Sequence, residues 1–159
     1  MAKKLRGRLS SGTMGFSPIK ATGALFYCRS TNRYLFLLRD EDKNSNTWGL
    51  VGGRVEEGES VHQALLREMT EEIGSIPKIE KTIPLDLYMS QDNNFEYHTY
   101  VCIVDCEFVP VLNHEHKGYC WTVMSGLPKP LHPALFNAIN VEEIKTKLNS
   151  IQDNFLNIS

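Results

Sequence analysis

The stretch from Gly52 to Ile76 reads GGRVEEGESVHQALLREMTEEIGSI, and it decides how the rest of the chain is interpreted. Ser60 followed three residues later by Gln63 is the pattern of a capping box, which predicts that a helix begins after Ser60. Gly74 predicts where that helix ends, because glycine readily takes the left-handed conformation found just beyond helix C-termini. The sequence therefore predicts one well-delimited helix preceded by a glycine-rich segment.

The predicted helix carries glutamates where a helix built only for stability carries other side chains. Its aliphatic residues fall on one stripe at about 100° per residue: Val61, Leu65, Met69, Ile73 and Ile76. Glu68 and Glu72 fall at the edge of this stripe, and Glu71 lies close to them. Like charges one turn apart repel, and partial burial penalises an ionised carboxylate. A solvated face with Arg67 as salt-bridge partner is the plain structural interpretation, but such a face lies opposite the apolar stripe. A cation such as Mg²⁺ or Mn²⁺, which prefers oxygen ligands, removes the conflict.

Glycines border this helix on its N-terminal side. Gly52 and Gly53 follow a short apolar run that begins at Trp48, and Gly58 precedes the helix. We expect a loop to begin at the glycine pair, where backbone groups approach a phosphate or a metal closely. An ordinary connection between two elements has the same composition, so both interpretations stay open.

The spacing across the segment resembles the Nudix box, G-x5-E-x7-R-E-U-x-E-E-x-G-U, in which U is a bulky aliphatic residue. Gly53 and Glu59 occupy the first two fixed positions, and residues 67–75 (REMTEEIGS) supply the remainder. Only the last position departs from the pattern, because Ser75 stands where an aliphatic residue is usual. We expect this change to shift one packing contact and to leave the chemistry intact. Trp48 ahead of GLVGG, and the sequence YCW at 119–121, also resemble the family.

The resemblance implies a fold, a reaction and a set of site residues. The implied fold is α/β (α+β), a Nudix-type α/β/α sandwich around a mixed β-sheet. Nudix enzymes hydrolyse a nucleoside diphosphate linked to another moiety; water attacks phosphorus, and divalent ions, usually Mg²⁺, neutralise the diphosphate. The resemblance implies that Arg67 orients the box glutamates and that Glu59 makes a supporting salt bridge. The implied metal ligands are the carbonyl of Gly53 and the side chains of Glu68, Glu71 and Glu72.

The general base stays open at this point. Glu72 is one candidate if the metal leaves it free. Glu115 is another, because many family members carry a glutamate in this loop that binds metal or activates water. His114 and His116 flank Glu115, and histidine has a suitable pKa without tuning.

The sequence predicts a substrate class rather than one substrate. A nucleoside triphosphate, a sugar nucleotide and ADP-ribose all remain candidates, because the subfamily markers downstream of the box are absent from residues 90–93 (SQDN). Arg39 and Arg54 are expected to contact the substrate's phosphates, and Lys129 and His132 are also available. The aromatic residues available to stack on a base are Phe26, Tyr88, Phe95, Tyr97 and Trp121.

Composition and charge exclude several other classes. The chain has 159 residues, 42% hydrophobic and 23% charged, which is an ordinary balance for one globular domain. Its 17 basic and 19 acidic residues give a net charge of −2, unlike a general nucleic-acid coat. No apolar run approaches the ~20 residues of a membrane span, and no signal-peptide pattern opens the chain. We expect a cytoplasmic monomer or homodimer with reduced cysteines, whose partner is a small nucleotide and not a membrane or a nucleic acid.

The remaining sequence is expected to form a flexible basic tail over residues 1–17 and a single domain over 18–159. Strands are predicted at 21–28, 34–38, 48–51, 82–89, 95–108 and 119–123, and closing helices at 132–139 and 141–156. Two other functions stay open. An RNA 5′-end pyrophosphohydrolase would use the basic tail as an RNA arm, which the acidic balance disfavours. A non-catalytic nucleotide-binding Nudix module usually lacks a box glutamate, whereas this chain has all of them.

Overall fold

A computed structural model describes residues 17–156, so the predicted basic tail lies, apart from its last residue, outside the described range. Four strands precede the first helix: β1 (Ile19–Cys28), β2 (Arg33–Arg39), β3 (Trp48–Gly49) and β4 (Val51–Arg54). The first helix and the next three strands are α1 (Val61–Ile73), β5 (Lys81–Met89), β6 (Phe95–Val104) and β7 (His116–Thr122). A 3-10 turn at Met124–Gly126 leads to α2 (Pro133–Ile139) and α3 (Glu142–Phe155).

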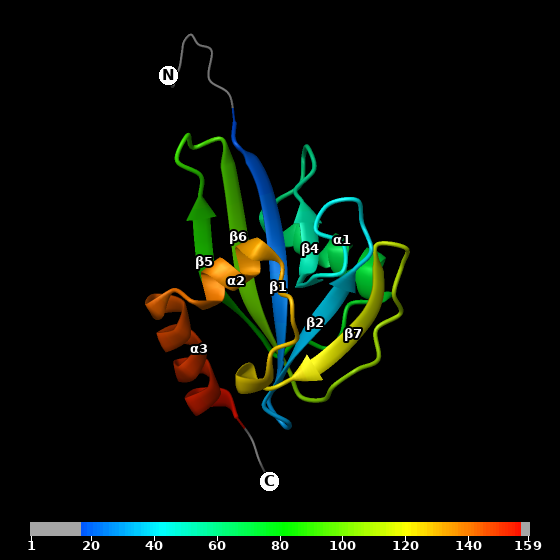
Figure 1. The fold of residues 1–159 in the computed structure, drawn as a ribbon, viewed down its shortest axis with the longest axis vertical. Helices are drawn as coiled ribbons and strands as arrows, with labels where there is room; N and C mark the ends of the chain where they lie inside the picture. The colour runs from blue at the N-terminus through cyan, green and yellow to red at the C-terminus, as the bar shows by residue number, and fades with distance from the viewer. Residues whose placement is uncertain (1–16, 157–159) are drawn as a thin grey trace.

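The seven strands of the described residues form one mixed sheet with β1 near its centre (Figure 1). β6 pairs with β1 in parallel along its whole length, from Ile19 opposite Phe95 onward. The other side of β1 is shared between two partners. Its first half pairs with β4, and only Tyr27 and Cys28 pair with β2. β1 and β2 therefore diverge after their hairpin, and β4 lies beside β1 where β2 has left it.

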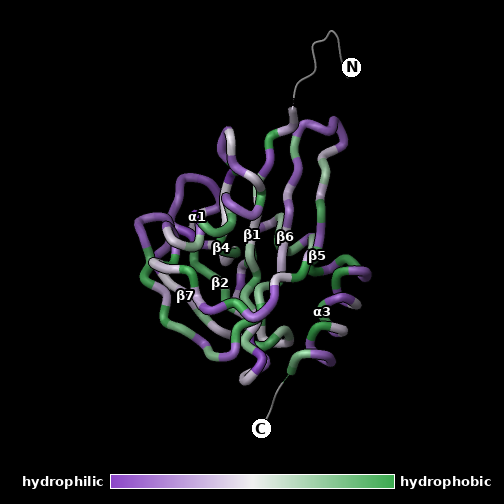
Figure 2. Tube along the Cα trace, turned by 180° about the vertical axis from the view of Figure 1, so that it is seen from behind, coloured by the Kyte–Doolittle hydropathy of each residue, from purple (hydrophilic) through white to green (hydrophobic). Residues whose placement is uncertain are grey.

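Helices cover both faces of this sheet, because successive side chains of a strand point to opposite faces. One face carries Phe26 of β1 and packs against α1 through Leu65. The other face carries Leu25 and Tyr27 and packs against α3 through Leu148. Figure 2 shows hydrophobic and hydrophilic residues alternating along α3, as expected for a helix with one buried side. The predicted α/β/α sandwich around a mixed sheet is confirmed.

The ends of α1 are those that the sequence predicts. The Ser60 hydroxyl accepts a hydrogen bond from the Gln63 backbone N–H at 3.0 Å, and the Gln63 side chain accepts one from the Ser60 N–H at 2.8 Å. Gly74 ends the helix with φ of 91°, a left-handed conformation that favours glycine. These caps fix which residues of α1 face the sheet.

Some predicted boundaries are wrong, and the glycine pair is the most informative case. Gly52 and Gly53 do not begin a loop; they lie within β4, opposite Gly23 and Thr22 of β1. A side chain at Gly52 would collide with the Thr22 carbonyl, so glycine here permits a close approach of two strands. The strand predicted to reach residue 108 ends at Val104, and β7 begins at residue 116 instead of 119.

No helix among residues 17–156 is long and apolar enough to cross a membrane. The four cysteines are free thiols: Cys28 and Cys102 are buried, Cys120 is half-buried and Cys106 is exposed.

Candidate active site

Two glutamates of α1 are buried against the sheet. Glu68 is 8% exposed and Glu72 is 2% exposed, although glutamate is seldom buried in proteins. The prediction that they lie at the edge of the apolar stripe is confirmed. Their partner Glu71 is different, because its side chain is 51% exposed and lies on the solvent side of the helix.

Both buried carboxyl groups lie against the backbone of β4. The N–H of Gly52 donates to Glu72 Oε1 at 3.0 Å. At the next residue, a Cβ on Gly53 would run into the carboxyl group of Glu68. The glycine pair therefore brings the backbone close to the carboxyl groups of α1, and it does so from a strand. The sequence did not predict the hydrogen bond from Gly52 to Glu72. The only indication of a role for Gly52 was its position next to Gly53.

Burial dominates the electrostatics of this pair. It raises the pKa of Glu72 well above the ordinary value, and the neighbouring Glu68 and Glu115 carboxylates raise it further against the lowering effect of the Gly52 N–H. Burial likewise raises the pKa of Glu68, with Arg67 opposing that shift. Without a cation, burial therefore favours the protonated form of Glu72 at neutral pH. A divalent ion would displace that proton and supply the missing charge.

The side chain of Arg67 connects α1 to the segment before it. Its Nε donates to Glu59 at 2.7 Å, and its Nη1 lies 3.2 Å from Glu68 and 3.3 Å from Glu71. Its Nη2 donates to the Arg54 carbonyl at 2.9 Å. These contacts raise the pKa of the guanidinium and lower that of Glu59. The salt bridge to Glu59 is therefore present, and Arg67 is placed to orient two of the box glutamates.

Glu115 reaches the same region from the segment before β7. Its carbonyl accepts from the Asp40 N–H at 2.8 Å, and its own N–H donates to Asn113 Oδ1 at 2.9 Å. Its carboxylate is close enough to Glu72 to raise the pKa of that group. The structure thus brings together Glu68, Glu72, Gly53 and Glu115, which are separate in sequence.

The two candidate histidines differ sharply. His114 is exposed in the loop. His116 is the first residue of β7 and is only 5% exposed. Burial and the nearby Arg39 lower the pKa of His116 to about 4, so its ring is neutral and weakly basic at pH 7. The low pKa of His116 therefore makes it a weak candidate for the general base.

The candidate substrate-binding residues come from different elements of the fold. Arg54 ends β4 with an exposed side chain. Arg39 ends β2, where its guanidinium lies 3.3 Å from Glu41 and donates to the Lys43 carbonyl at 3.1 Å. Lys129 is exposed ahead of α2, and His132 caps that helix by accepting from the Ala134 N–H at 3.1 Å.

Most of the candidate stacking aromatics are committed elsewhere. Phe26 is fully buried and packs edge-on against Phe108, which also packs against Trp121. The ring centroids of Tyr88 on β5 and Phe95 on β6 lie 6.4 Å apart. Tyr97 also lies 6.4 Å from Phe95, centroid to centroid, and its hydroxyl lies where a side chain of Gly23 would otherwise be.

The hydroxyl of Tyr97 is affected by the charges of the site. Burial raises the pKa of its hydroxyl to about 12, and the charges of Glu72 and Arg39 act on it in opposite directions. The phenol is therefore a neutral hydroxyl at pH 7.

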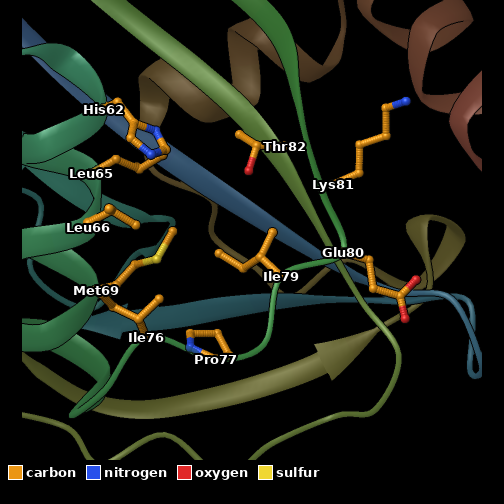
Figure 3. A pocket seen from close by; sticks show the side chains of 10 residues that line it. All are labelled: His62, Leu65, Leu66, Met69, Ile76, Pro77, Ile79, Glu80, Lys81 and Thr82. Atoms are coloured by element: carbon orange, nitrogen blue, oxygen red, sulfur yellow. The ribbon is translucent and has the colours of Figure 1, made fainter.

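A pocket of about 380 Å³ lies on another side of α1 (Figure 3). Its walls are mainly aliphatic side chains of α1 and of the segment leading into β5, with Glu80 and Lys81 near the rim. None of the three box glutamates lines it. This pocket is therefore separate from the carboxylate site.

The sequence of the chain matches the family model described as NUDIX domain over residues 18–140. An ADP-ribose pyrophosphatase of Methanocaldococcus jannaschii is 37% identical over 67 residues, which is 42% of this chain and only 38% of that relative's length.

The fold is similar to that of solved Nudix structures. A MutT NUDIX hydrolase from Burkholderia pseudomallei superposes with a TM-score of 0.60 and 25% identity, over 78% of this chain and 97% of that one. The NUDIX domain of Shewanella oneidensis NrtR, solved in complex with ADP ribose, gives a TM-score of 0.66 over 84% and 90% of the two chains, at 17% identity. The family-model match covers most of the chain and includes the entire carboxylate site, so the chain belongs to the Nudix family.

Proposed function

We propose that this protein is a Nudix hydrolase that cleaves the pyrophosphate bond of a nucleoside diphosphate linked to another moiety. The outer moiety is a phosphate, a sugar or a ribose, as in a nucleoside triphosphate, a sugar nucleotide or ADP-ribose. The carrying observation is the buried Glu68–Glu72 pair held against the backbone of β4. A protein that needed only a stable fold would not bury two carboxyl groups that repel each other.

The residues present fit a divalent cation, and Nudix hydrolases generally use one. Among residues 17–156 no three His, Cys, Asp or Glu side chains converge as a formed metal site. The donor set is nevertheless suitable, because the buried carboxyl groups of Glu68 and Glu72 lie against Gly53 and Gly52 of β4. Glu71 contacts Arg67, which also contacts Glu68. We propose that Gly53, Glu68, Glu71 and Glu72 hold Mg²⁺, with Mn²⁺ as a substitute. When bound, the ion neutralises the diphosphate and lowers the pKa of a bound water.

The protein's own groups supply positioning and proton transfer. Arg67 holds Glu68 and Glu71 in place from one side, and the Gly52 N–H holds Glu72 from the other. We propose Glu115 as the general base that accepts the proton of the attacking water, because it approaches the site from outside α1. Glu72 is the second candidate, if the bound ion leaves one of its oxygens free.

The test is a panel of nucleoside triphosphates, sugar nucleotides and ADP-ribose, each with Mg²⁺ and each with EDTA. We expect release of a nucleoside monophosphate with Mg²⁺ and none with EDTA. Release of inorganic phosphate alone would identify a different bond and overturn the proposal. Tight binding of a nucleotide with no turnover would show a binding module instead.

A further inference from the structure

β5 forms an outer edge of the sheet, because among residues 17–156 the only strand paired with it is β6. Figure 1 shows its C-terminal end at the margin of the sheet, reaching beyond α2 and α3. Three consecutive large apolar side chains lie at that end: Leu87 is 54% exposed, Tyr88 54% and Met89 45%. An exposed apolar edge strand can pair with a strand of another chain, so most proteins protect such edges.

The first half of β5 carries protection of this kind. Pro84 has no N–H to offer a further strand, and the register with β6 shifts between Pro84 and Asp86. The Nζ of Lys147 on α3 donates to the outer side of the strand, at the Leu85 carbonyl, over 3.1 Å. The three exposed residues that follow include neither a proline nor a charge. The unprotected part of the edge is therefore confined to the end of the strand.

The hydrogen-bond phase of β5 shows which backbone groups face outward there. The Ser90 N–H donates to the Phe95 carbonyl at 2.9 Å, so the backbone of Ser90 faces β6. In an antiparallel pair, residues that hydrogen-bond to the partner strand alternate with residues whose backbone groups point away from it. Leu87 and Met89 occupy the alternate positions of this register, so their N–H and C=O groups point away from β6. The edge offers two donors and two acceptors on residues two positions apart.

This arrangement is complementary to itself. In an antiparallel pairing around a two-fold axis at Tyr88, Leu87 of each copy lies opposite Met89 of the other. Each such pair exchanges two hydrogen bonds, so every outward N–H and C=O of the two residues gains a partner. Leu87 and Met89 of the two copies also form apolar cross-strand pairs on one face of the joined sheet. Asp86 lies opposite the uncharged Ser90, so no like charges oppose each other.

We propose that the protein forms a homodimer in which residues 86–90 of β5 pair antiparallel with the same residues of a second copy, which joins the two sheets edge to edge. A two-fold contact of this kind is closed, so association stops at two copies. The paired segment is short, so the interface is of the small, reversible class. The inference goes beyond the proposed function and does not depend on it, because residues 86–90 include none of the proposed metal ligands or bases.

The first experiment measures the oligomeric state by sedimentation over a concentration series. We expect a reversible monomer–dimer equilibrium in the wild type. Leu87→Lys and Met89→Lys should each raise the dissociation constant by about tenfold or more, because a lysine at the edge removes an apolar pair and places two like charges near the axis. Val109→Lys adds the same charge to an aliphatic residue that is 75% exposed on another segment, and it should keep the wild-type constant.

A second experiment tests the register. Tyr88 is the position that lies opposite itself, at a non-hydrogen-bonded pair whose Cα atoms are about 4.5 Å apart. That spacing permits a disulfide. In a Cys106→Ser background, which removes the exposed native thiol, oxidation of Tyr88→Cys should give a covalent dimer. Leu87→Cys in the same background lies opposite Met89 and should give little covalent dimer.

The outcomes that overturn the proposal are distinct. A protein that stays monomeric over the whole series contradicts it, whether the edge is then free or covered by another segment of the chain. A dimer that both lysine variants leave intact has its interface elsewhere. Equal cross-linking of the two cysteine variants contradicts the two-fold register. Melting temperatures in dilute solution check that the lysine variants fold, and the cysteine pair tests the proposal independently of them.

Failure of this proposal is distinguishable from failure of the proposed function. Sedimentation and cross-linking need neither nucleotide nor metal, so they report the dimer whether or not the protein hydrolyses any substrate.

Discussion

The backbone N–H of Gly52 donates to the side chain of Glu72 over 3.0 Å, so the strand that carries the first box residue is bonded directly to the helix that carries the last carboxylates. The bond joins positions 20 residues apart. It also fixes the orientation of the Glu72 carboxyl group relative to β4. The strand and the helix therefore cannot shift relative to each other without moving a proposed metal ligand.

Glu72→Gln tests the role of that carboxyl group. The amide keeps an oxygen for the Gly52 N–H, so the fold survives while a charged ligand is lost. We expect kcat to fall by about 100-fold or more. We also expect the metal-free variant to melt no lower than the wild type and to gain less stability from Mg²⁺. The exposed Glu57→Gln, which changes net charge equally, is the matched control. Near-normal turnover by Glu72→Gln at saturating Mg²⁺ would rule out the metal assignment.

The pH dependence of stability follows from the same pair. The native pKa of Glu72 lies above the ordinary 4.5, so between these values the native state binds more protons than the unfolded state. Stability of the metal-free protein from this group is therefore present at low pH and is lost as pH rises. We expect the melting temperature of the wild type minus that of Glu72→Gln to decrease between pH 5 and pH 8 in EDTA. His116, whose lowered pKa acts in the opposite direction, is present in both proteins and cancels. A difference that stays flat or increases would contradict the burial effect.

Gly52→Ala and Gly53→Ala should separate stability from activity. The added methyl at Gly52 meets the backbone of Thr22 and Gly23, which cannot move without disrupting the sheet. We expect a loss of about 1–3 kcal/mol or more in the free energy of unfolding. The methyl at Gly53 meets only the flexible end of Glu68, so Gly53→Ala should fold but turn over slowly. Denaturant unfolding and kcat, measured on both variants, give the comparison; equal stability losses would argue against it.

Arg67→Lys tests whether the Arg67 side chain positions the carboxylates of the Nudix box. The guanidinium of Arg67 donates two hydrogen bonds to the Glu59 carboxylate, from Nε at 2.7 Å and from Nη2 at 3.0 Å, while Nη1 contacts Glu68 and Glu71. Lysine keeps the charge but cannot make these contacts at the same time. We expect the apparent affinity for Mg²⁺ to weaken by about 10–100-fold, with a smaller effect on kcat at saturating Mg²⁺. A Mg²⁺ titration of the rate distinguishes the two effects. An unchanged titration midpoint would limit Arg67 to a structural role.

Glu115→Gln should lower kcat with little change in KM, because the group acts on the attacking water and not on substrate binding. The comparison is His114→Ala, an exposed neighbour from which we expect nearly wild-type rates. An inactive His114 variant beside an active Glu115→Gln would reassign the base.

The burial pattern of α1 could be predicted from the sequence, whereas the boundaries of several strands could not. The burial of Glu68 and Glu72 could be derived from the helical period alone, because the caps at Ser60 and Gly74 fixed the phase of α1. The placement of the glycine pair inside β4 could not, since it depends on β1 lying alongside, a contact that local sequence does not encode. Likewise, the sequence around Arg39 and His116 does not indicate that these two residues lie opposite each other. They pair across β2 and β7, next to an irregularity in the strand register.

The parallel pairing of β1 with β6 also bears on how the chain reaches its native state. The Thr22 hydroxyl donates to the carbonyl of His98 at a separation of 76 positions, and the ten-residue register around it is equally long-range. Contacts of this span form late, because a long loop must close before they are gained. A fragment that contains the complete Nudix box but stops before β6 would lack the strand that pairs in parallel with β1. It would also lack Tyr97, which belongs to β6. We therefore expect catalytic competence to appear in the slowest refolding phase, after the helical signal of α1 has already recovered.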